Sequence, residues 1–227
     1  GGFGASALSA LLLMTVILLG LFMTFAISKL LSSTLLKGIP SSFALELPPY
    51  RKPQVGKVLV RSIFDRTLFV LGRAAAVAAP AGLLIWVLAN VSVGGETLLT
   101  HCAGFLDPFA QLFGLDGVIL LAFLLGLPAN EIVIPIVIMA YLSQGSLVDM
   151  TDLNALHALL VNHGWTWVTA LCTMIFSLMH WPCSTTCMTI YKETKSLKWT
   201  AAAFLIPTLC GLLLCFLIAS AARIFGM

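Results

Sequence analysis

The sequence predicts an all-α polytopic membrane protein, and three observations support this fold class. Of its 227 residues, 60% are hydrophobic and only 9% are charged, whereas a soluble domain carries about 25% charged residues. Several apolar runs reach the roughly 20 residues that a helix needs to cross the ~30 Å hydrocarbon core of a bilayer. The basic residues gather mainly in two segments between these runs. We therefore expect the lipid bilayer to surround most of the chain.

Four apolar runs are predicted to be full transmembrane helices, and they cover 8–36, 69–93, 165–180 and 199–222. The first run contains Lys29, whose long side chain can reach an interface. A fifth run, 118–142, is long enough to cross but contains Pro128, Glu131 and Pro135. Two prolines in one run predict a broken, re-entrant helical hairpin rather than a straight span.

Amphipathic segments are predicted to lie at the membrane surface beside these runs. Basic residues recur among apolar ones over 58–73, a pattern typical of a helix in the headgroup plane. Phenylalanines recur over 100–113, and 149–162 is amphipathic with Thr151 or Asp152 as its N-cap.

The distribution of positive charge favours the hairpin. Seven of the 12 basic residues lie within 37–73, which places that loop in the cytoplasm, because cytoplasmic loops carry an excess of Lys and Arg. The next basic cluster is Lys192, Lys195 and Lys198. A single crossing by 118–142 would place this second cluster outside, whereas a hairpin places it in the cytoplasm as well. We therefore predict that both clusters face the same side.

The first candidate site surrounds Glu131, which is the one acid deep in an apolar run. A carboxylate at bilayer depth costs about 2.5–3.5 kcal/mol, so it usually lines a cavity or meets a partner. Pro128 and Pro135 should free backbone carbonyls beside it, because proline has no N–H to donate. The alternative is a protonated Glu131 that joins two helices through a hydrogen bond.

The second candidate site is the segment 177–187, which reads SLMHWPCSTTC. Pro182 is predicted to interrupt the helix and to start a new half-helix at Cys183, where the helix dipole favours a thiolate. Imidazole, thiol and hydroxyl groups together suit Fe²⁺ or Zn²⁺ better than Mg²⁺ or Ca²⁺. The alternative is that Cys183 is a small core residue and the hydroxyls only cap the helix. The candidate metal ligands of the two sites are Glu131, His180, Cys183 and Cys187, and the candidate route-lining residues are Asn130, Ser184 and Thr185.

Other classes of protein are excluded by what the sequence lacks. It contains no GxSxG, HExxH or GxxxxGK[ST] motif, which argues against a hydrolase, a zinc protease and a nucleotide-binding loop. The six cysteines form no CxxC pair, and 12 basic residues are too few for a nucleic-acid surface. We expect neither an enzyme nor a nucleic-acid partner, and no tightly bound cofactor.

Three motifs, in this order, resemble the ferrous iron transport protein B family: ELPPYR at 46–51, LPANEIVI at 127–134 and HWPCSTT at 180–186. The resemblance covers nearly the whole chain, which divides into 1–57 (first transmembrane helix and ELPPYR loop) and 58–227 (a Gate-type transmembrane domain with the terminal helix). It implies a multi-pass permease of the bacterial inner membrane with Fe²⁺ as its substrate. The family's membrane cysteine after proline corresponds to Cys183, and its Gate-domain acid to Glu131.

The sequence departs from the family pattern because the GTP-binding domain, the helical domain after it and the first Gate domain are absent from it. We therefore expect the membrane half of a transporter, as a fragment or a split subunit, that binds no GTP itself. The implied partners are the G domain and the first Gate half, a second copy of the chain, and small Feo-type accessory proteins.

Two other functions remain open from the residues. A Gate-type protein that carries no metal, such as a nucleoside-type carrier or a membrane assembly protein, would also use broken hairpins, and Asn130 with Glu131 could hydrogen-bond an organic substrate. An intramembrane hydrolase is the third hypothesis, and it is the weakest because no catalytic triad is visible in the sequence. The cysteine and histidine of 177–187 favour a metal.

Overall fold

The computed structural model describes residues 3–34, 54–61, 64, 67–147 and 149–226. The ELPPYR motif and most of the predicted basic loop lie outside these residues. The chain forms two compact units, 1–69 and 70–227, which are treated separately below. Helices account for nearly all of the regular structure in both, as an all-α polytopic membrane protein requires.

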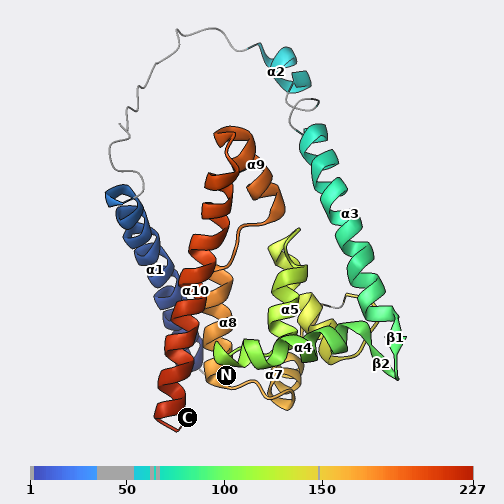
Figure 1. Ribbon diagram of the computed structural model, residues 1–227, viewed down its shortest axis with the longest axis vertical. Coiled ribbons are helices and arrows are strands. Elements are labelled where there is room, and N and C mark those ends of the chain that lie inside the picture. Colours follow the sequence, from blue (N-terminus) through green and yellow to red (C-terminus); the bar gives the residue numbers. More distant parts are fainter. Residues whose placement is uncertain (1–2, 35–53, 62–63, 65–66, 148, 227) are drawn as a thin grey trace. The chain divides into compact units, whose positions relative to one another are not determined.

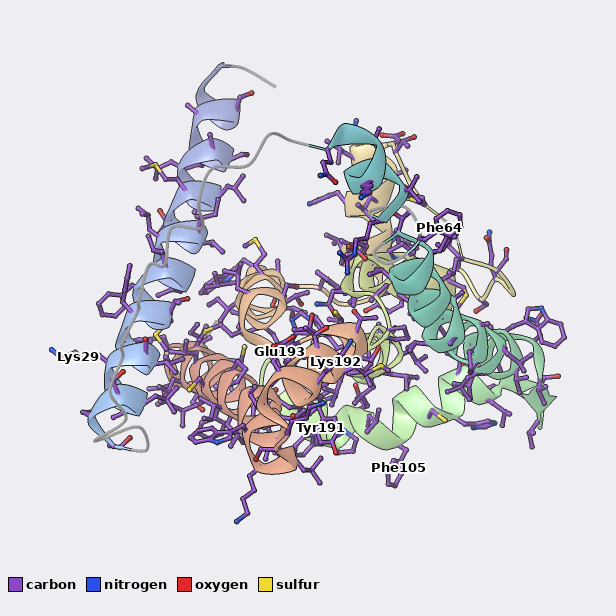
Figure 2. The ribbon with its side chains drawn as sticks, turned by 90° about the horizontal axis from the view of Figure 1, so that it is seen from above. Lys29, Phe64, Phe105, Tyr191, Lys192 and Glu193 are labelled. Atoms are coloured by element: carbon purple, nitrogen blue, oxygen red, sulfur yellow. The ribbon has the colours of Figure 1, made fainter. Side chains whose placement is uncertain are left out.

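The first unit contains the first predicted span. Helix α1 (Phe3–Ser33) has 31 residues, and its apolar side chains are exposed all round, as suits a helix surrounded by lipid. The hydroxyls of Thr15 and Thr24 donate to carbonyls one turn back, so these two hydroxyls are not left unpaired in lipid. Lys29 extends away from the helix near its C-terminal end (Figure 2). The short helix α2 (Val55–Arg61) follows.

The second unit opens with a span and an interfacial helix. Helix α3 (Phe69–Asn90) is long and apolar enough to cross a membrane from Val70 to Asn90. A two-stranded hairpin, β1 (Ser92–Val93) and β2 (Glu96–Thr97), turns at Gly94 and Gly95, both with positive φ.

Helix α4 (Leu98–Leu112) matches the predicted interfacial segment. Its N-cap is Thr97, whose hydroxyl accepts from the Thr100 amide. The axis of α4 meets that of the next helix at 108°, so α4 lies across the end of the unit (Figure 1). Phe105 is 85% exposed and points away from the unit (Figure 2), which suits a side chain in the bilayer interface.

The fifth apolar run forms the predicted re-entrant hairpin. Helices α5 (Gly117–Leu125) and α6 (Val133–Tyr141) have nine residues each, so each rises about 14 Å, roughly half of the hydrocarbon core. The Tyr141 hydroxyl at the end of α6 donates to the carboxylate of Asp116, which immediately precedes α5. Both ends of the run are therefore on the same side, and the alternative of one crossing is wrong.

The hairpin forms much of the core of this unit. Most of the α5 side chains are buried, and so is the middle of α6. Phe123 contacts Phe176 of α8 edge to face, with ring centroids 4.8 Å apart. Protein side chains therefore cover most of the hairpin, although Leu124 and Ile134 are exposed.

The third predicted span is a discontinuous helix that extends beyond the predicted end at residue 180. Helix α7 (Leu153–Asn162), capped by Asp152, precedes it. Helix α8 (Trp167–Met179) has 13 residues, too few to cross alone, and α9 (Ser184–Thr194) continues it after a four-residue break. The apolar run ends at the break because α9 carries hydroxyls and charges. Hydropathy therefore does not identify α9 as the second half of the span.

The last helix, α10 (Leu197–Ile224), matches the fourth predicted span. It packs along α8, where the Cys172 thiol donates to the Cys215 carbonyl at 3.8 Å and the Cys215 thiol to the Cys172 carbonyl at 3.4 Å. Lys195 adopts a left-handed conformation (φ 50°) between α9 and α10, which reverses the chain within two residues.

The arrangement of the second unit agrees with the charge prediction. The start of α3 and the turn between α9 and α10 lie at one end of the unit, and α4, α7 and the base of the hairpin lie at the other (Figure 1). The cluster of Lys192, Lys195 and Lys198 is therefore at the end where α3 begins.

We expect cysteines placed at Lys57 and Lys195, in a protein whose native cysteines are replaced by serine, to react with an impermeant maleimide from the cytoplasmic side. A cysteine at the exposed Glu96, one crossing later, should react only from the opposite side. The measurement is labelling of intact cells against inside-out vesicles. If the cysteines at positions 57 and 195 react from opposite sides, this topology is wrong.

Candidate functional site

The two proline-containing breaks meet in the structure. The amide of Ser184, the first residue of α9, donates to the carbonyl of Leu127 at the tip of the hairpin, at 2.9 Å. The first amides of a helix have no partner within the helix, and unwound backbone needs partners when it is not exposed to water. One hydrogen bond therefore satisfies one unpaired group from each break and holds the two sites side by side.

The hairpin tip consists of an unwound stretch and a short 3-10 helix, η2 (Asn130–Ile132). Pro128 lies in the unwound stretch, as expected, but the Leu124 carbonyl is not free because the Leu127 amide donates to it at 3.4 Å. Pro135 does not break a helix. It lies in the first turn of α6, where the amide would have no partner in any helix, so it favours the start of α6 rather than its interruption.

Asn130 and Glu131 are both exposed at this tip. They sit in the 3-10 turn, and they are not buried between the helices of the hairpin. This position fits a carboxylate that lines a route better than one that joins two packed helices.

The second break places Cys183 at the N-cap of α9. Pro182 interrupts the helix as predicted, α8 ends at Met179 and regular α9 begins at Ser184. The Cys183 sulfur is 3.1 Å from the hydroxyl of Thr185 and 3.0 Å from that of Thr186. Two hydroxyls and the positive end of the α9 dipole therefore lie beside the Cys183 sulfur.

The remaining candidates have different surroundings. The Cys187 thiol donates to the carbonyl of Pro182 at 3.6 Å, which ties it to the break. His180 is half-buried, and its Nδ1 lies 2.9 Å from the Ser177 carbonyl. Ser184 and Thr185 lie in the first turn of α9 and are half-buried.

These candidates do not form a closed metal cage. Within the described part of the chain, no group of three or more His, Cys, Asp or Glu side chains is arranged to hold a metal ion. The structure brings the two breaks together through Leu127 and Ser184, but it does not gather Glu131, His180, Cys183 and Cys187 around one point.

A polar cavity at the base of the hairpin could not be predicted from the sequence. Its volume is about 510 Å³. Asp107 accepts from the Gly117 amide at 2.9 Å, and the Trp165 indole donates to the Tyr141 hydroxyl at 2.7 Å. These two bonds hold the ends of the hairpin in place. The charged and ionisable residues that line the cavity are Asp107, Asp116, His163 and Arg223.

The fold and the meeting breaks define a class of protein: a multi-pass, all-α membrane protein with discontinuous helices, the arrangement in which transporters hold their substrates. The chain belongs to the Gate family, described as "Nucleoside recognition", which matches residues 71–197. The family described as "Ferrous iron transport protein B C terminus" matches residues 13–65. The predicted resemblance to ferrous iron transport protein B is therefore confirmed, and it concerns the C-terminal membrane part of that transporter.

Curated relatives agree with this assignment. The Fe(2+) transporter FeoB of Staphylococcus aureus (strain MSSA476) is 28% identical over 95% of this chain and 32% of its own length. The Fe(2+) transporter FeoB of Synechocystis sp. is 28% identical over 94% of this chain and 33% of its own length. The protein of the same name from Campylobacter jejuni is 26% identical over 90% of this chain and 35% of its own length. The chain thus spans about a third of each relative. No solved structure matches it.

Proposed function

We propose that this chain forms part of the route by which Fe²⁺ crosses the bacterial inner membrane. The observation that carries the proposal is the hydrogen bond between Ser184 and Leu127, because it joins the two breaks on which Cys183 and Glu131 lie. The names of the relatives and the match over residues 13–65 favour Fe²⁺ over the nucleoside-type cargo of other Gate proteins.

The proposed ligands suit the ion. A thiolate from Cys183 and a carboxylate from Glu131 form a mixed donor set, which favours Fe²⁺ over the harder Mg²⁺. A transport site must also release its ion, so two or three protein ligands serve better than a closed cage. The absence of a preformed three-residue cluster in the described part of the chain is compatible with such a weak site. Cys187 is a further candidate metal ligand, and Thr185 is a candidate route-lining residue.

Coupling to GTP, in this proposal, comes from a G domain outside this sequence, in the same polypeptide or in a separate subunit. The first Gate half, a second copy of the chain and small accessory proteins are the further proposed partners. The basic end of the second unit, with Lys192, Lys195 and Lys198, is the proposed cytoplasmic end.

The function is tested by uptake of radioactive iron, kept reduced with ascorbate, into bacteria that lack their own ferrous uptake system. We expect cells that produce the chain together with a G domain and a first Gate half to accumulate iron faster than cells that produce these partners alone. A large excess of Mg²⁺ should leave the rate unchanged, because a thiolate-containing site discriminates against hard cations. Uptake no faster than in the cells that produce the partners alone, from a chain shown to be inserted, would contradict the proposal.

A further inference from the structure

Three buried polar atoms lie close together in sequence at the break between α8 and α9. They are Nε2 of His180, Nε1 of Trp181 and Oγ of Ser184, and none has a hydrogen-bond partner within the described residues. Trp181 is 94% buried, since its exposed fraction is 6%. Buried polar groups are almost always paired, so an unpaired group indicates a partner that the protein itself does not supply.

The structure determines which nitrogen of His180 carries the hydrogen. Nδ1 lies 2.9 Å from the carbonyl of Ser177 and 3.2 Å from that of Phe176. A carbonyl can only accept, so Nδ1 must donate, and in the neutral ring Nε2 then presents a free lone pair. Metal-binding histidines are held in this way, with one nitrogen donating to a carbonyl and the other facing the metal.

The surroundings of the imidazole raise the cost of leaving that lone pair unused. The His180 ring lies 5.1 Å from the ring of Phe123 and 6.0 Å from that of Phe176, measured between centroids. The Trp181 ring is 6.1 Å away and stacks on Phe204. Among aromatic side chains, an unpaired acceptor has little water to compensate it.

The three atoms differ in the bonds that they can form. Nε2 of His180 only accepts, Nε1 of Trp181 only donates, and the Ser184 hydroxyl does both. A bare cation would satisfy Nε2 and could contact Ser184, but it would leave the indole N–H without an acceptor. A cation that keeps some of its water satisfies all three, because water supplies the oxygen that Trp181 needs.

We propose that His180 is an ion ligand whose Nε2 binds a partly hydrated borderline divalent cation at the break. The Ser184 hydroxyl accepts a hydrogen bond from a water of the ion, and the Trp181 N–H donates to water beside it. The inference rests on the proposed function in one respect, since it takes the ion to be the transported Fe²⁺. Imidazole binds Fe²⁺, Co²⁺ and Zn²⁺ well and Mg²⁺ poorly, so His180 would add to the selectivity of the site.

The test uses Co²⁺ as a spectroscopic substitute for Fe²⁺, with the purified protein in lipid nanodiscs. We expect saturable visible absorption bands in the wild type, and an apparent Kd roughly tenfold or more higher in His180→Ala, because a lost ligand costs at least as much as a lost supporting group. His157→Ala is the matched control, an exposed histidine on α7, and should bind Co²⁺ like the wild type. An unchanged Kd in His180→Ala would overturn the proposal, as would the lack of saturable binding by the wild type.

A second variant keeps the test decisive if His180→Ala does not fold. The sequence has four histidines, so replacing His101, His157 and His163 by alanine leaves His180 alone. X-ray absorption of bound Co²⁺ in this variant should show the outer-shell scattering of one imidazole, and spectra with oxygen and sulfur ligands only would refute the proposal. Imidazole binding without iron uptake would refute the transport function and leave the His180 site intact.

Discussion

Glu131→Gln and Cys183→Ser are each expected to reduce Fe²⁺ uptake about tenfold or more, since losing a ligand weakens a metal site at least that much. Glutamine keeps the size of the Glu131 side chain but removes its charge. Serine replaces the Cys183 thiolate by a neutral hydroxyl, which binds Fe²⁺ weakly. The measurement is the initial rate of iron uptake, divided by the amount of inserted protein.

Matched controls exist for both substitutions. Glu193→Gln changes an exposed acid on α9 (Figure 2), and Cys210→Ser changes a half-buried thiol on α10, so both should transport at the wild-type rate. If Glu131→Gln and Cys183→Ser also transport at that rate, the breaks are packing features and the ion takes another path.

The re-entrant hairpin could be predicted because two independent signals agreed. Prolines at 128 and 135 indicated that the run could not be a regular helix throughout, and the positions of the lysines required an even number of crossings. The structure adds the bond between Tyr141 and Asp116 that closes the base of the hairpin.

The end of the third span could not be predicted because the hydropathy pattern ends before the helix does. After Pro182, α9 is rich in threonine and carries Lys192 and Glu193, so its composition resembles that of a loop. What holds it as a continuation of α8 is tertiary packing, mainly against α10. The prediction that Pro135 breaks a helix was also wrong. A proline in the first turn favours the start of a helix, whereas a proline further along interrupts it, and the sequence alone does not show which position Pro135 has.

The candidate residues could be selected from the sequence, but the hydrogen bond that joins their two breaks could not be predicted. Cys183 and Glu131 are conspicuous in sequence because Cys183 directly follows a proline and Glu131 lies between two prolines, Pro128 and Pro135. The pairing of the Leu127 carbonyl with the Ser184 amide joins distant segments through backbone atoms, which are the same in every residue and leave no compositional signal. The role of Trp181 could not be predicted for a related reason, since only the structure shows that its N–H has no partner among the described residues.

Gly117→Ala is expected to destabilise the second unit by about 3 kcal/mol or more, the upper part of the range for overpacked sites. Gly117 is the first residue of α5 and lies against α4. A Cβ there would be 2.0 Å from the carbonyl oxygen of Ala103 and 2.9 Å from the amide nitrogen of Asp107. Both are backbone atoms, so no change of rotamer can relieve the clash.

The same clash would disturb the hydrogen bond from the Gly117 amide to the Asp107 carboxylate, which is 2.9 Å long. Because α5 carries the hairpin tip, we expect lost stability and lost uptake together. The control is Gly104→Ala on α4, where an added Cβ meets no atom within 4 Å. Alanine there should raise stability by up to about 1 kcal/mol, its advantage over glycine in a helix. Thermal unfolding in detergent measures the difference, and equal stability of the two variants would show that α4 and α5 do not pack this closely.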